Sequence, residues 1–167
     1  SHMVAKYMAV AYFGISVLGC LAFWLAGMNF FDAINHAMSA ISTGGFSTSD
    51  LSLAKWTQPA VHWVAVVLMI LGSLPFVLYV STLRGNFSAV LNDQQVRGFL
   101  GILISVWLSM GTWYYFTTDL HWLDALRHVA VNATSVMTTT GFALGDYSLW
   151  GGFCLLYTSD AADDSLR

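Results

Sequence analysis

Three long apolar stretches constrain this sequence more than any other feature. They cover residues 4–25, 61–82 and 99–116, and Lys6 is the only charged residue in them. A 22-residue helix is about 33 Å long, which is enough to cross the hydrocarbon core of a bilayer. Three such stretches exceed what the core of so small a soluble domain can bury. They predict an all-α integral membrane protein.

Composition agrees with this prediction. Of the 167 residues, 57% are hydrophobic and only 9% are charged, whereas soluble domains are about 25% charged. Six basic residues cannot form a nucleic-acid-binding patch, and two cysteines cannot form a disulfide framework. All nine acidic residues are Asp, although exposed faces of soluble helices normally use Glu. We therefore exclude soluble, nucleic-acid-binding and disulfide-rich classes.

Two further segments, residues 32–42 and 124–137, are shorter and partly polar. As helices they would be about 16 and 21 Å long, too short to span a membrane. Each begins with Asp, which suits the positive end of a helix, and each ends in a Thr/Gly run. We expect re-entrant half-helices, because irregular backbone at membrane depth must line a cavity or be buried in protein.

The charged residues suggest an orientation. Lys6, Arg84 and Arg97 lie at one end of the predicted spans, which the positive-inside rule places in the cytoplasm. The opposite side has Lys55 and Arg127 but more acidic residues, an excess that would attract cations. These acidic residues are Asp32, Asp50, Asp119, Asp124 and Asp146.

The two short segments belong to an internal repeat. Asp-Ala-Ile-Asn-His at 32–36 matches Asp-Ala-Leu-Arg-His at 124–128, and the Gly-Phe steps at Gly45 and Gly141 are 96 residues apart. A third matching block begins at Asp50 and Asp146. The repeating unit is a long helix, a half-helix, a glycine loop and a second long helix. We expect one complete unit, a connecting loop and a partial unit, at residues 4–83, 84–97 and 98–153.

The glycine loops point to cation chemistry. A half-helix directs the negative end of its dipole into the membrane, and loop carbonyls can replace the water around a dehydrated cation. Glycine permits backbone angles that other residues avoid, and a preceding Thr adds a hydroxyl oxygen. The pattern predicts a cation filter but does not identify the ion.

The loop sequences Ser-Thr-Gly-Gly-Phe-Ser (42–47) and Thr-Thr-Thr-Gly-Phe-Ala (138–143) resemble filter loops of the Trk/Ktr/HKT superfamily of potassium transporters. The likeness is strongest to the TrkH-type membrane subunit and extends over about residues 5–152. It implies four units of outer helix, re-entrant pore helix, filter loop and inner helix around one pore, with pseudo-fourfold symmetry. The present units resemble the second and third.

The resemblance also implies a site. K⁺, the transported ion, would bind backbone carbonyls, with no covalent cofactor and no catalysis. The implied filter carbonyls belong to Thr43, Gly44, Gly45, Thr139, Thr140 and Gly141, and the filter also includes Phe46 and Phe142. Asp50 and Asp146, each five residues after a filter glycine, are candidates for the outer mouth.

The family further implies a multi-pass protein of the cell inner (plasma) membrane. Its partners would be the lipid bilayer, the missing repeats of the same subunit, a second copy in a homodimer and a cytoplasmic nucleotide-binding regulatory subunit, but no nucleic acid. Two of four loops cannot close a pore. Because the first and fourth loops lie outside this sequence, sodium remains an alternative ion.

Other interpretations remain open. One is a different pore-loop cation channel, and another is a non-conducting membrane scaffold. Ser135, His128 and Asp124 could suggest an enzyme, but the repeat accounts for them and there is no nucleophile elbow. His36 and His128 fit packing behind the loops better than metal binding. Residues 154–167 resemble a translated adapter sequence and residues 1–3 a tag remnant, so neither enters the fold prediction.

Overall fold

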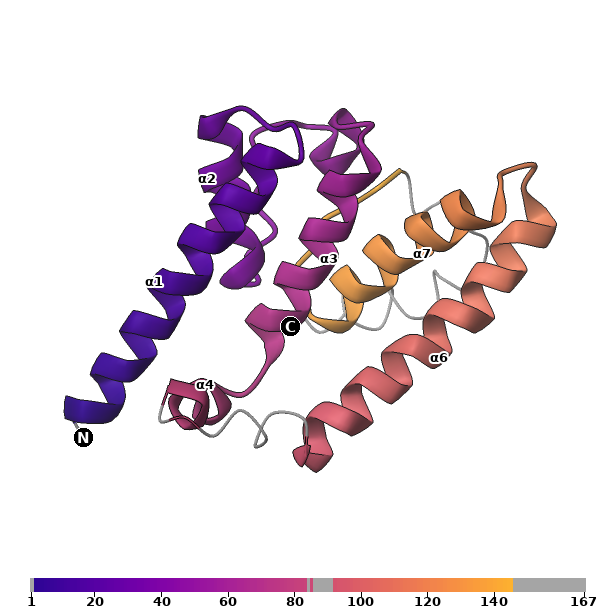
Figure 1. The fold of residues 1–167 in the computed structure, drawn as a ribbon. Coiled ribbons are helices and arrows are strands. Elements are labelled where there is room, and N and C mark those ends of the chain that lie inside the picture. Colours follow the sequence, from indigo (N-terminus) through magenta and orange to yellow (C-terminus); the bar gives the residue numbers. More distant parts are fainter. Residues whose placement is uncertain (1, 84, 86–91, 146–167) are drawn as a thin grey trace, which may run out of the picture.

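The computed structural model describes residues 2–83, 85 and 92–145. The described residues form helices and loops without a strand, which confirms the predicted all-α fold. Figure 1 shows the arrangement. The elements are α1 (His2–Leu25), α2 (Phe30–Ile41), the short 3₁₀ helix η1 (Ser52–Lys55), α3 (Pro59–Ser73), α4 (Phe76–Leu83), α6 (Gln94–Thr117) and α7 (Trp122–Met137).

The two short segments are helices that enter from one side of the molecule and end partway through it (Figure 1). Both begin two residues before the predicted Asp, so Asp32 and Asp124 lie in the first turn. Asn29 caps α2 by accepting a hydrogen bond from the backbone N–H of Asp32, and His121 caps α7. These caps supply acceptors that the first turn of a helix otherwise lacks.

The sequence repeat is also a spatial repeat. Helix α1 packs on α2 as α6 packs on α7, and α3 contacts both half-helices. Small side chains on α2 (Ala33, Ala37 and Ala40) are fully buried and let the neighbouring helices approach closely. Gly72 of α3 lies directly against the end of α2, because an added Cβ would be 2.5 Å from the carbonyl oxygen of Ile41. The contact of α3 with α7 joins the two units.

The second apolar stretch differs from the prediction of one span over residues 61–82. It forms two helices, α3 and α4, separated at Leu74 and Pro75. Proline has no N–H, so it cannot donate to the carbonyl of Leu71, and it disfavours helical angles at Leu74. In the described residues, only α1 (over Met3–Leu25) and α6 are long and apolar enough to cross a bilayer by themselves.

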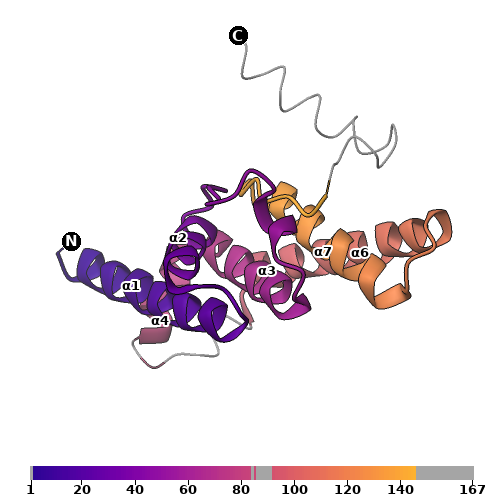
Figure 2. The ribbon, with the colours of Figure 1, turned by 90° about the horizontal axis from the view of Figure 1, so that it is seen from above.

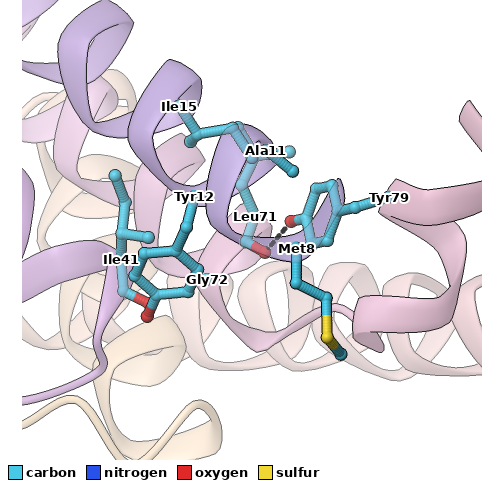
Figure 3. Close-up of a pocket in the computed structure, with 8 residues that line it drawn as sticks. All are labelled: Met8, Ala11, Tyr12, Ile15, Ile41, Leu71, Gly72 and Tyr79. Carbon is cyan, nitrogen blue, oxygen red and sulfur yellow. Dashed lines mark hydrogen bonds between the residues drawn. The ribbon is translucent and has the colours of Figure 1, made fainter. Parts of the chain in front are cut away.

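Two tyrosine hydroxyls bind carbonyls at helix ends near this break. Tyr79 of α4 donates to the carbonyl oxygen of Leu71, and Tyr12 of α1 donates to that of Ile41 at 2.8 Å. These residues, with Gly72, line a small pocket between α1, α3 and the end of α2 (Figure 3). The break in the inner helix and the end of the half-helix α2 therefore meet at one place.

Candidate functional site

The two glycine loops lie side by side. In the view from above, the segment after α2 meets the segment after α7 (Figure 2). A Cβ added to Gly45 would overlap the carbonyl oxygen of Thr140, so the loops touch at the backbone. The backbone N–H of Leu53 also donates to the carbonyl oxygen of Ala143 at 3.1 Å. Residues about 90 positions apart in the chain thus form one structure.

Both half-helices end in the same way. The residue after the cap is Thr43 in the first loop and Thr139 in the second, with φ of 51° and 56°. Such a left-handed residue usually is glycine, and a residue with a Cβ costs about 1–2 kcal/mol there. Two hydrogen bonds close each end: Thr43 N to Ala40 O and Gly44 N to Ser39 O in the first, and Thr139 N to Val136 O and Thr140 N to Ser135 O in the second.

The loop carbonyls differ from those of the helices in their hydrogen bonding. Among the described residues, none of the carbonyl oxygens at 43–45 and 139–141 accepts a hydrogen bond. Gly45 and Gly141 have φ of 68° and 90° and continue the irregular backbone. These six oxygens are therefore available to a ligand such as a dehydrated cation.

The two loop phenylalanines occupy opposite environments. Phe142 is 0% exposed and stacks on His36 of the other unit, with ring centroids 5.7 Å apart. Trp56 contacts the same imidazole edge-on at 4.7 Å. Phe46, at the matching position of the first loop, is 80% exposed. The first unit thus provides a buried aromatic site for the second loop, whereas Phe46 is uncovered.

Hydrogen bonds from His36 and Asp32 tie the end of the first loop to α2. His36 Nδ1 donates to the Asp32 carbonyl at 2.8 Å, which leaves Nε2 to accept from the Ser47 hydroxyl at 2.9 Å. The Asp32 carboxylate accepts a hydrogen bond from the Thr48 hydroxyl and lies 3.6 Å from the Lys55 ammonium group. The Thr48 bond, followed by the Lys55 charge, lowers the pKa of Asp32, and burial lowers the pKa of His36.

In the second unit, a different residue ties the loop to its half-helix. Counting forward from Asp pairs His36 with His128, whereas counting back from the filter glycine pairs His36 with Asn132. Because α7 is longer, Asn132 is the residue nine positions before Gly141, as His36 is nine before Gly45. Asn132 is buried and binds both backbone groups of Leu144. Counting back from the glycine is the signal that could have identified it.

The remaining candidates lie elsewhere. His128 stacks on Tyr114 of α6 at 6.3 Å, and Asp124 forms an ion pair with Arg127 at 3.0 Å. These contacts do not join them to Ser135 as a catalytic triad. Asp50 is exposed in the turn after the first loop, while Asp146 and the tail at 154–167 lie outside the described residues. No group of three metal-ligating side chains occurs in the part of the chain that the structure describes.

Fold and site together define a class: a helical membrane protein built from repeated units, each with a half-helix and a glycine loop. Within that class the chain belongs to the TrkH family, described as a cation transport protein, whose family model matches residues 2–157.

Individual relatives agree with the family. The chain is 42% identical to the Trk system potassium uptake protein TrkI of Halomonas elongata, over 89% of this chain and 30% of that protein. It is 34% identical to TrkG of Escherichia coli, over 82% of this chain and 28% of that protein. The crystal structure of the potassium transporter TrkH from Vibrio parahaemolyticus superposes with a TM-score of 0.87 at 27% identity, covering 93% of this chain and 34% of that one. The chain therefore spans about a third of the length of these relatives.

Proposed function

We propose that this chain is part of a membrane subunit that takes up K⁺ through a filter of backbone carbonyls. The observation that carries the proposal is the pair of matched, touching loops, whose six carbonyl oxygens accept no hydrogen bond from the described part of the chain. The related proteins named above are potassium uptake proteins, and the superposed structure is a potassium transporter.

In this proposal the filter works by replacing water. A K⁺ ion entering the outer mouth exchanges its hydration shell for carbonyl oxygens at 43–45 and 139–141. The C-terminal ends of α2 and α7 add negative potential at the same depth. Asp50 and Asp146 would raise the local concentration of cations at the mouth. No covalent chemistry is involved, and K⁺ is the cargo.

We further propose that residues 4–83 and 98–153 are the second unit and part of the third unit of a pseudo-fourfold subunit. The exposed Phe46 supports this assignment. Phe142 is buried against a pore helix of the unit before its own, so the matching surface for Phe46 would lie on a preceding unit. The remaining repeats of the same subunit would thereby complete the ring of carbonyls.

The wider assembly follows from the family. We propose a multi-pass protein of the cell inner membrane that forms a homodimer and binds a cytoplasmic nucleotide-binding regulatory subunit. The apolar helices α1 and α6 support the membrane location. A sodium-conducting channel is the alternative on the same fold, because the ion is set by all four loops together.

The test uses the full-length gene in a bacterial strain that lacks potassium uptake, with growth measured at low K⁺. We expect the wild-type gene to restore growth and Gly141→Asp to abolish it, because a carboxylate would occupy the ion path. Rescue that depends on Na⁺ but not on K⁺ would favour the alternative ion. Full rescue by Gly141→Asp together with Gly45→Asp would contradict the filter.

The structure also identifies the better glycine for separating a filter from a non-conducting scaffold. Gly45→Ala would disrupt either one, because its Cβ overlaps Thr140. A Cβ at Gly141 meets no described atom within 4 Å, although φ of 90° makes alanine strained there. Gly141→Ala that reaches the membrane at normal abundance but loses K⁺ uptake would support the filter, and normal uptake would contradict a filter role for Gly141. A scaffold is indicated only if the wild-type protein itself gives no K⁺ uptake.

A further inference from the structure

The two residues after Phe142 have all four of their backbone polar groups bound. Ala143 N–H donates to the Ser52 hydroxyl and its carbonyl accepts from Leu53 N–H, both at 3.1 Å. Leu144 N–H donates to the Asn132 side-chain oxygen at 2.8 Å, and its carbonyl accepts from the Asn132 amide nitrogen at 3.0 Å. Ala143 is thus held by the first unit, and Leu144 by its own half-helix. The exit of the second loop is fixed from two sides.

Among the described residues, the Asn132 side chain has hydrogen bonds to Leu144 alone. It is 2% exposed on α7, where a buried amide without partners would be costly. Both ends of its side chain bind one residue, so the contact fixes the direction of the Leu144 peptide groups as well as their distance. His36, at the same register in the first unit, makes one hydrogen bond to its own loop, with the Ser47 side chain. The two loops are therefore held by unlike groups.

Ser52 is held in a conformation that favours glycine. Its φ is 50°, in the left-handed region, where a residue with a Cβ is strained by about 1–2 kcal/mol. Glycine would fit this backbone more easily but could not accept the hydrogen bond from Ala143. The strain and the hydroxyl contact occur at the same residue, which connects η1 of the first unit to the second loop.

We propose that Asn132 and Ser52 are positioning residues that set the outer end of the second filter loop and so contribute to K⁺ selectivity. The proposal rests on the proposed function, because it assigns a role within that filter. At its inner end, the loop is anchored by Thr140 N–H on the Ser135 carbonyl at 2.9 Å. At its outer end it is anchored at Ala143 and Leu144. The carbonyl of Gly141 lies between these anchors, and selectivity depends on how such oxygens are held.

The experiment measures uptake of K⁺ and Na⁺ by the full-length protein in the potassium-uptake-deficient strain, with membrane abundance and thermal midpoint measured in parallel. The variants are Ser52→Gly, Ser52→Ala and Asn132→Leu. Exposed residues provide the matched controls Ser109→Ala on α6 and Asn35→Leu on α2. We expect Ser52→Gly to accumulate normally, because glycine suits the backbone, and to lower the K⁺/Na⁺ uptake ratio by about fivefold, the factor for one hydrogen bond.

The outcomes separate this inference from the proposed function. If wild-type protein fails to restore K⁺ uptake, or Gly141→Asp retains it, the filter itself is wrong. If both behave as proposed and Ser52→Gly keeps the wild-type ratio at wild-type abundance, the positioning role is overturned. A lower ratio in Ser52→Gly with unchanged controls supports it. If Asn132→Leu does not accumulate, the Ser52 variants decide the outcome.

Discussion

At the scale of single residues, the two loops are held by side chains with different chemistry. His36 and Asp32 hold the first loop through groups that titrate, whereas Asn132 holds the second through an amide that does not. His36 also supports Phe142, so one imidazole contributes to both loops. Burial favours the neutral ring there, in which Nδ1 donates to the Asp32 carbonyl and Nε2 accepts from the Ser47 hydroxyl.

The preference of His36 for the neutral form predicts a pH dependence of stability. Burial lowers the pKa of His36 below its ordinary value of 6.5, so the unfolded chain takes up the proton first. Its contribution to stability is therefore present above pH 6.5 and is lost as the pH falls from there toward the folded-state pKa. We expect the thermal midpoint of the full-length protein to fall over this window, and to fall less in His36→Gln. An equal fall in both proteins would contradict the assignment.

At the scale of elements, helix ends rather than helix interiors distinguish this fold. The backbone leaves the helical region at Thr43 and Thr139, just after α2 and α7, and at Leu74, just after α3. The carbonyls released at two of these ends, Ile41 and Leu71, receive hydroxyls from Tyr12 and Tyr79. A break in a membrane helix is tolerated when side chains satisfy the freed groups.

The hydrogen bond at the break between α3 and α4 predicts a specific loss of stability. Tyr79→Phe removes the hydroxyl that binds the Leu71 carbonyl while keeping the ring, so we expect stability to fall by about 1 kcal/mol. Denaturant or thermal unfolding of the purified full-length protein measures the change. Tyr115→Phe is the control, because Tyr115 is exposed on α6. Equal stability of the two variants would show that the hydroxyl contact does not stabilise the break.

At the scale of the whole molecule, an aromatic side chain of the second unit helps to join the two units. The second loop inserts Phe142 into the core of the first unit, next to His36 and Trp56. Phe46 has no such cover in the described residues. If the units repeat around an axis, each loop phenylalanine is buried by the unit before it.

Two phenylalanine variants test this arrangement. Phe142→Ala leaves a cavity in a packed core and is expected to cost about 3–5 kcal/mol. In the full-length protein we expect Phe46→Ala to be comparably destabilising, because a preceding unit would bury that ring. Thermal unfolding of both variants measures the effect. A Phe46→Ala protein as stable as wild type would show that Phe46 is exposed there too.

Several features of the helices follow from the local sequence. The half-helices end where the Thr/Gly runs begin, because those residues adopt left-handed angles that a helix does not contain. Asp32 and Asp124 lie in first turns, as their charge favours. The break at Pro75 occurs because proline has no N–H to donate. Residues 61–82 are apolar throughout, so hydropathy alone did not show that Pro75 divides them into α3 and α4. Because α7 is one turn longer than α2, the match of His36 to His128 counts from the helix start, whereas the match of His36 to Asn132 counts from the loop.

The sequence by itself determined the helical membrane class, the repeat and the positions of both loops, since hydrophobicity, spacing and backbone preference are local properties of the chain. Only the tertiary structure decided that Gly45 touches Thr140, that Phe142 is buried while Phe46 is exposed, and that Asn132 and Ser52 hold Leu144 and Ala143. These contacts join residues up to 106 positions apart, as in Phe142 on His36, or depend on helix length, and no local pattern specifies which groups will meet across such distances.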